Sequence, residues 1–87
     1  MDSDEETPFR YVYILESLQI KEAHYTGLTD NLRQRSAKHN AGEVPHTSKF
    51  KPWRIETAIA FSNPAKAAVF EQYLKTGSGR AFAKRHL

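Results

Sequence analysis

Two tyrosines, an arginine, a histidine and a glutamate are the residues of this sequence whose types could combine in one reaction. They are Tyr13, Tyr25, Arg35, His39 and Glu71. A carboxylate can hold a metal ion, a hydroxyl or imidazole can position or deprotonate water, and a guanidinium can stabilise negative charge that develops on phosphorus. If the fold brings the five side chains around one cavity, the set would suit hydrolysis of a phosphodiester bond.

Arg35 and His39 are four residues apart in a segment with helical punctuation, so they would lie on one face of a helix. Arg33 and Lys38 would lie elsewhere around that helix, which is therefore not a uniform ring of charge. The segment alone fits equally an ordinary solvated surface helix whose cations have no chemical role. The sequence leaves both interpretations open.

Glu71 is the only acidic residue of the second expected helix, and it lies at the edge of that helix's apolar face. The apolar face consists of Ala67, Phe70, Tyr73 and Leu74. A carboxylate in such a place needs a partner, because burying an unpaired charge is costly. The partner could be a metal ion or, as an alternative, an arginine of the first helix.

Tyr13 and Tyr25 belong to runs of residues that favour β-structure, where tyrosine commonly has a packing role. Core packing is therefore the default interpretation of both. Their hydroxyl groups gain a chemical role only if the faces that carry Arg35 and Glu71 meet them.

The elements that must position these residues are expected in the order β-β-α-β-α-α, which indicates an α/β or α+β fold with helices against a small sheet. The expected strands are 10–15, 24–27 and 54–61, and the expected helices are 31–40, the segment between Asn63 and Gly77, and 78–87. Residues 43–53 contain two prolines and neither periodicity, which predicts a loop.

Polar residues at the ends of the helices predict where they begin and end. Thr29 or Asp30 would cap the first helix, and residues 40–42 would end it. Asn63 would cap the second helix and Gly77 would terminate it.

Composition and charge limit the classes of protein to consider. The 87 residues, 39% of them hydrophobic, suit one domain, which we expect at 9–87 behind a disordered acidic tail at 1–8. No cysteine is present, which excludes disulfides and thiolate chemistry. No apolar run approaches the roughly 20 residues that span a membrane, so we expect a soluble cytoplasmic protein.

The expected domain is basic. From Phe9 onward it has 13 basic and 6 acidic side chains, a net charge of +7, which favours phosphate-rich partners. The residues that could contact phosphates are Lys49, Lys51, Arg54, Lys75, Arg80, Lys84 and Arg85. Trp53 or Phe50 could stack on an unpaired base, although packing against the loop is the preferred interpretation of Trp53.

The positions of these residues resemble those of the GIY-YIG endonuclease domain family, in its small single-domain branch. The two motifs that name the family are similar to Tyr11-Val12-Tyr13 and Tyr25-Thr26-Gly27. The family's arginine, the histidine one turn later and the metal-binding glutamate of the following long helix match Arg35, His39 and Glu71. The resemblance covers about residues 9–87, nearly the whole chain.

The first of these motifs begins with Tyr11 where the family has glycine, and the second has Thr26 where the family has isoleucine. Leu28 stands where some members carry a lysine that is thought to assist the base, so assistance by a lysine is not expected here.

The resemblance implies a small three-stranded antiparallel sheet flanked by helices, and hydrolysis of the DNA backbone that depends on Mg²⁺ or Mn²⁺. Carried over by position, Tyr13 would activate the water with help from Tyr25, and Arg35 would stabilise the transition state. Glu71 would hold the metal, and His39 would contact phosphate or help transfer protons. A role in DNA repair or recombination would fit, with help from a DNA-binding partner protein. The alternative is a nucleic-acid-binding module with little or no catalysis that needs a partner.

Overall fold

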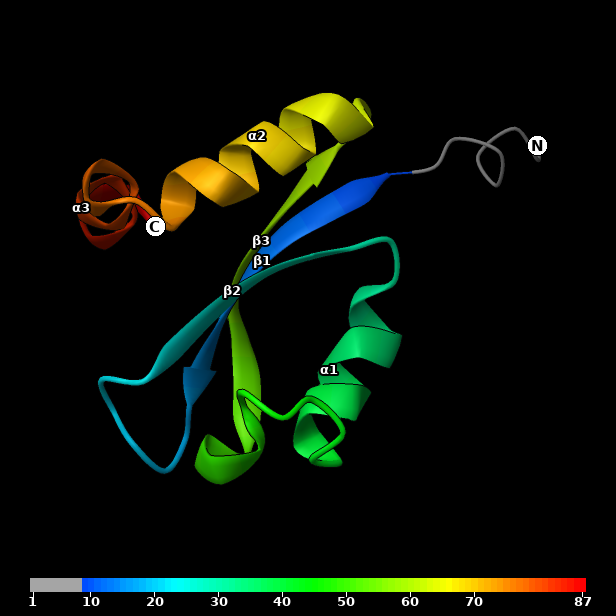
Figure 1. Cartoon of the computed structure of the whole chain (residues 1–87), viewed down its shortest axis with the longest axis vertical. Coiled ribbons are helices and arrows are strands. Elements are labelled where there is room, and N and C mark those ends of the chain that lie inside the picture. Colours follow the sequence, from blue (N-terminus) through cyan, green and yellow to red (C-terminus); the bar gives the residue numbers. More distant parts are fainter. Residues whose placement is uncertain (1–8) are drawn as a thin grey trace.

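The computed structural model describes residues 9–87, so the expected acidic tail at 1–8 lies outside the described residues. Three antiparallel strands form one sheet in the order β2-β1-β3 (Figure 1). The strands are β1 (Arg10–Ser17), β2 (His24–Thr29) and β3 (Trp53–Phe61). The predicted α+β class is therefore confirmed, with β1 as the central strand.

The helices are α1 (Leu32–Asn40), α2 (Pro64–Leu74) and α3 (Gly77–His86), with a 3₁₀ turn, η2 (Ser48–Phe50), before β3. The element order is the predicted one. Figure 1 shows α1 and α2 on opposite sides of the strands, with α3 at the far end of α2. Within residues 9–87, the helices are all too short and too polar to cross a membrane.

Two small cores lie on the two faces of β1, because successive side chains of a strand point to opposite faces. Val12 and Ile14 pack with Ala67 and Leu74 of α2. On the other face, Tyr13, Leu15 and Trp53 form a second cluster, against which Leu32 of α1 packs. Each face of the central strand thus holds one helix in place.

A β-bulge interrupts the pairing of β1 with β3. Ile14 is opposite Thr57 and Leu15 is opposite Ile55, so Glu56 is an extra residue on β3. The pairing of β1 with β2 is regular and sets Tyr13 opposite Gly27.

The start of α1 differs from the prediction. Asn31, rather than Thr29 or Asp30, is the N-cap, and its side chain accepts a hydrogen bond of 3.0 Å from the backbone N–H of Gln34. Thr29 instead accepts a hydrogen bond from the backbone N–H of Asn31, which fixes the turn before the helix. The predicted end holds, because Gly42 follows the helix with a positive φ of 79°.

Asn63 caps α2 as predicted, by accepting hydrogen bonds from the backbone N–H groups of Ala65 and Lys66. The prediction that Gly77 terminates this helix is wrong, because α2 ends at Leu74 and Gly77 is the first residue of α3. Thr76 stabilises both the end of α2 and the start of α3. Its hydroxyl donates a hydrogen bond to the carbonyl of Tyr73 and accepts one from the backbone N–H of Gly79. The two helices therefore meet at a tight corner.

Candidate active site

Tyr13 occupies the middle of the central strand, and only 1% of its surface is exposed. Its ring lies across Gly27 on β2, where a Cβ atom would collide with the phenol oxygen. The glycine of the second motif thus provides the space that the Tyr13 hydroxyl occupies.

His39 is 0% exposed, so the surface-helix interpretation is wrong for this face of α1. Its Nε2 atom lies 3.0 Å from the Tyr13 hydroxyl, and its Nδ1 atom lies 2.8 Å from the Thr47 hydroxyl. The sequence analysis did not identify Thr47, which comes from the loop between α1 and β3. Neither its residue type nor its distance from His39 in the sequence indicates a role in a site. Only the folded loop brings it to His39.

Tyr25 completes a group of three rings. Its ring centroid lies 6.3 Å from that of Tyr13 and 4.8 Å from that of His39. Tyr25 is half-buried and also lines an open cavity of about 970 Å³ between the sheet and α3. Two of the candidate residues are therefore buried, and the third connects them to solvent.

Charges around Tyr13 act on its hydroxyl in opposite directions. Burial raises the pKa of Tyr13 to about 12, and Tyr25 and the Glu71 carboxylate add to the increase. Arg35 lowers the same pKa through its positive charge and side-chain hydrogen bonding. Arg35 and Glu71 thus both act on the pKa of the Tyr13 hydroxyl, in opposite directions.

His39 is held neutral by its surroundings. Its pKa is lowered from 6.5, first because the imidazole is buried and second because of the nearby Arg35 charge. A neutral imidazole keeps one ring nitrogen available as a proton acceptor.

Glu71 is only 6% exposed and pairs with the cation that follows its own helix. The Nζ atom of Lys75, the C-cap residue of α2, lies 2.6 Å from its carboxylate, and the Gln72 amide donates a hydrogen bond of 3.1 Å. The expected alternative, an ion pair with an arginine of the first helix, is therefore replaced by a pair with the C-cap residue of α2.

The comparison with protein families agrees with this geometry. The family model described as the GIY-YIG catalytic domain matches residues 9–85. The chain belongs to the GIY-YIG family. Neither the curated proteins nor the solved structures gave a match. Members of the GIY-YIG family are nucleases that act on DNA and generally depend on a metal ion.

The side chains near Tyr13 fit the metal that GIY-YIG nucleases generally use. Mg²⁺ and Mn²⁺ prefer oxygen ligands, and Mg²⁺ is usually bound by one or two carboxylates together with water and substrate phosphate. Glu71 supplies one such carboxylate. The ammonium group of Lys75 already lies beside it, where a metal ion would bind. The donor set therefore suits a cation that is held mainly by water and substrate.

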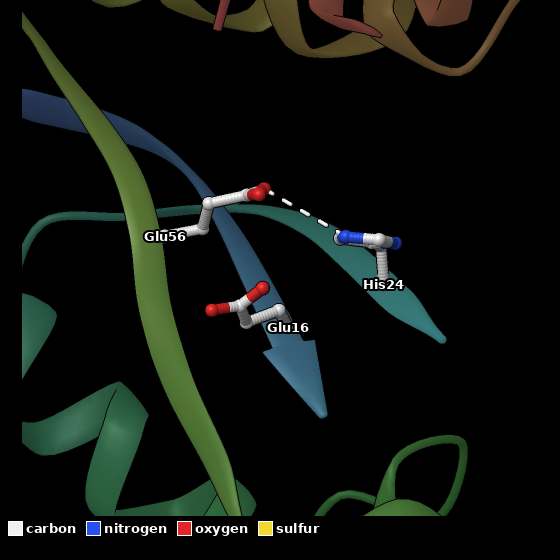
Figure 2. A group of neighbouring side chains, drawn as sticks. All are labelled: Glu16, His24 and Glu56. Atoms are coloured by element: carbon white, nitrogen blue, oxygen red, sulfur yellow. Dashed lines mark ion pairs between the residues drawn. The ribbon is translucent and has the colours of Figure 1, made fainter. Parts of the chain in front are cut away.

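A second group of metal-ligating side chains lies on the strands of this GIY-YIG domain. Figure 2 shows Glu16 on β1 between His24 on β2 and Glu56 on β3, with ligand atoms within 4.8 Å of one another. His24 and Glu56 are 3.8 Å apart, and Glu16 forms an ion pair with Arg54. Both carboxylates therefore have a protein partner. The group was not predicted from the sequence, because its members come from three different strands.

The seven basic candidates for DNA contact divide into groups. Arg54 is paired with Glu16, and Lys75 with Glu71. Lys75, Arg80 and Lys84 line the open cavity. The remaining three, all exposed, are Lys49, Lys51 and Arg85.

Trp53 is only 4% exposed, and its Nε1–H donates a 2.8 Å hydrogen bond to the carbonyl of Thr47. The packing interpretation is confirmed, and base stacking by Trp53 is excluded. Phe50 packs edge-on against it and is half-buried.

Proposed function

We propose that this GIY-YIG domain is a metal-dependent endonuclease that hydrolyses phosphodiester bonds of DNA. The main support is the buried contact of 3.0 Å between the Tyr13 hydroxyl and Nε2 of His39, at which the charges of Arg35 and Glu71 also act. This arrangement joins a proton acceptor, a hydroxyl and an anion-stabilising cation at one point.

Tyr13 passes a proton from the attacking water to His39. As the phenol oxygen takes a proton from water, its own proton moves to Nε2 of His39. The electron pair of the broken water O–H bond forms the new bond to phosphorus. The bond from phosphorus to the leaving sugar oxygen breaks, and that oxygen takes a proton from solvent.

The two proton movements are concerted, because a free phenolate is too costly in this site. Burial raises the pKa of Tyr13 to about 12, whereas the pKa of His39 is lowered. Neutral His39 is therefore a much weaker base than a Tyr13 phenolate, and ionising Tyr13 onto His39 in a separate step would be strongly unfavourable.

Arg35 stabilises the negative charge that develops on the phosphoryl oxygens. Its Nε atom is buried and has no hydrogen-bond partner in the part of the chain from 9 to 87. An unpaired buried donor is costly, and a phosphate oxygen would satisfy it. The side chain thus binds the reacting group more strongly as charge accumulates there.

Glu71 is the residue that would hold the metal ion, Mg²⁺ or Mn²⁺. When bound, the ion supplies Lewis-acid stabilisation of charge on the phosphoryl group. Lys75 would release the Glu71 carboxylate and turn toward the cavity that it lines with Arg80 and Lys84.

The basic cavity supports binding of the DNA backbone rather than of particular bases. Lys75, Arg80, Lys84 and Lys21 all line it. Contacts of this kind position DNA without reading its sequence. We therefore infer structure-directed cleavage in repair or recombination, aided by a DNA-binding partner protein.

The alternative is a binding module with weak or no catalysis. The observation that favours it is the pairing of Glu71 with Lys75, which occupies the carboxylate that the metal requires.

A cleavage assay distinguishes the nuclease from the binding module. Its substrates are branched, flapped, nicked and single-stranded DNA, each with Mg²⁺ or Mn²⁺. Arg35→Ala and Glu71→Ala should each lose about 100-fold or more in kcat while DNA binding survives. Arg33→Ala removes an exposed arginine of the same helix and serves as the control. Binding without cleavage in either metal would favour the module and contradict the nuclease.

A further inference from the structure

The loop between α1 and β3 holds one buried hydroxyl group against the site. Thr47 is 1% exposed, and its side chain lies between two groups. Its oxygen is 2.8 Å from Nδ1 of His39 and 3.2 Å from the carbonyl oxygen of Val44. The hydroxyl that contacts Nδ1 of His39 thus comes from the loop, and not from the sheet or from α1.

These two contacts point to one placement of the protons. The carbonyl oxygen of Val44 only accepts, so the Thr47 hydroxyl donates its single hydrogen in this contact. The Thr47 oxygen can then only accept from His39, which places the His39 proton on Nδ1. Nε2 is left with a free electron pair and accepts the hydrogen bond of the Tyr13 hydroxyl.

Thr47 is itself held on both sides. Its backbone N–H donates to the carbonyl of Val44 at 3.0 Å, and its carbonyl accepts from Phe50 and from Nε1 of Trp53. Asn40 fixes the end of the loop through two hydrogen bonds to the backbone of Trp53. The hydroxyl is therefore preorganised before any substrate arrives.

We propose that Thr47 is a positioning residue that keeps His39 in the Nδ1–H tautomer, so that Nε2 can receive the Tyr13 proton. The proposal rests on the nuclease function for its kinetic consequence only. In the opposite tautomer Nε2 would carry a hydrogen and face the Tyr13 hydroxyl as a second donor. Tyr13 could then not give its proton to His39, whatever the geometry of the substrate.

The tautomer can be measured without any cleavage reaction. Nitrogen NMR of protein with ¹⁵N-labelled histidine, at pH 8, distinguishes ring nitrogens with and without a proton. The His39 signals are those missing in His39→Gln. The wild type and Thr47→Ser should show a proton on Nδ1 only, and a wild-type His39 with its proton on Nε2 would overturn the proposal.

Thr47→Val keeps the branched shape and removes the hydroxyl. It should move part or all of the His39 population to the Nε2–H form. It should also lower kcat on nicked or flapped DNA by about 10- to 100-fold with little change in KM, and Thr47→Ser should restore most of the rate. Ser48→Ala is the matched control, because Ser48 donates to the carbonyl of Pro45 in the same loop.

A folded Thr47→Val protein that keeps the Nδ1–H form, or that keeps the wild-type kcat, would contradict the role of Thr47. If the wild type cleaves no DNA, the nuclease proposal fails while the NMR result still decides the tautomer. If Thr47→Val does not fold, the wild-type and Thr47→Ser spectra carry the test.

Discussion

The phenol oxygen of Tyr13 occupies the space that a side chain at Gly27 would need. The two residues are directly opposite on β1 and β2, and the Tyr13 ring lies across the glycine. Tyr13 cannot move away easily, because it is fully buried in the cluster that includes Leu15 and Trp53. The second motif and the catalytic candidate of the first are thus one packing unit.

Gly27→Ala should therefore displace Tyr13 from His39. The new methyl group meets the end of a packed ring rather than a flexible side chain, so we expect a loss of about 1–3 kcal/mol in stability and a large loss of activity. Urea unfolding and cleavage kinetics would measure both. Gly77→Ala is the control, because a Cβ at Gly77 has no neighbour within 4 Å. Equal effects at the two glycines would contradict the packing explanation.

Tyr13 should make the protein less stable at alkaline pH. Its pKa is raised from 10.0 to about 12 in the folded state, so the contribution to stability is complete below pH 10 and is lost as the pH rises through 12. Two pKa units correspond to about 3 kcal/mol, of which about 2 kcal/mol would be lost between pH 9 and 11.5. Urea unfolding of wild type and Tyr13→Phe at these two pH values checks the difference. Parallel losses in both proteins would show that Tyr13 is not the group responsible.

The contribution of His39 to stability should depend on pH in the opposite direction. Because its folded-state pKa lies below 6.5, it contributes stability above pH 6.5 that is lost as the pH falls through the folded value. The acid limb of kcat should likewise have an apparent pKa below 6.5, since protonated His39 cannot accept the Tyr13 proton. Stability and kcat measured from pH 8 to 5 test this.

Two variants identify His39 as the source of that acid limb. His39→Gln should remove the contribution of His39 to the pH dependence of stability, together with most of the activity. His46→Gln, which changes an exposed histidine of the following loop, should change neither. An acid limb that persists in active His39→Gln protein would rule out His39 as the titrating group.

The sequence predicted the parts of the fold that depend on local pattern. Alternation in β1 and the spacing of Arg35 and His39 are local properties, and the structure has the strand and the helix that they indicate. The N-cap of α1 was missed because Thr29, Asp30 and Asn31 are all good cap residues, and backbone geometry chooses among them. The ion pair of Glu71 with Lys75 was not predicted, although the two residues have the i, i+4 spacing that is typical of such pairs.

Thr47 and the bulge at Glu56 could not be predicted in this way. Thr47 reaches His39 because the loop returns to the sheet and is fixed there by Asn40 and Trp53, which is a property of tertiary packing. The bulge follows from how β3 pairs with β1, and strand pairing leaves no periodic signal in a single strand. Contacts between distant segments were the common missing information.

Lys75 should compete with the metal ion for Glu71. The two side chains are 2.6 Å apart, so a divalent cation must displace the ammonium group before it can bind this carboxylate. Lys75→Met should therefore lower the Mn²⁺ concentration needed for half-maximal cleavage by several-fold. It should also lower the Tm of the metal-free protein, because the buried carboxylate loses its partner. Titrations of activity and of Tm with Mn²⁺ would measure the two effects.

Two further variants show whether Glu71 is the residue through which the metal acts. Glu71→Gln should abolish cleavage and the increase in Tm on addition of Mn²⁺, because the amide is a much weaker ligand than the carboxylate. Glu56→Gln changes the group on the strands that contains Glu16 and His24, and it should leave both responses intact. If Glu56→Gln instead removes the response of Tm to Mn²⁺ while Glu71→Gln keeps it, the metal binds on the strands and the assignment to Glu71 is wrong.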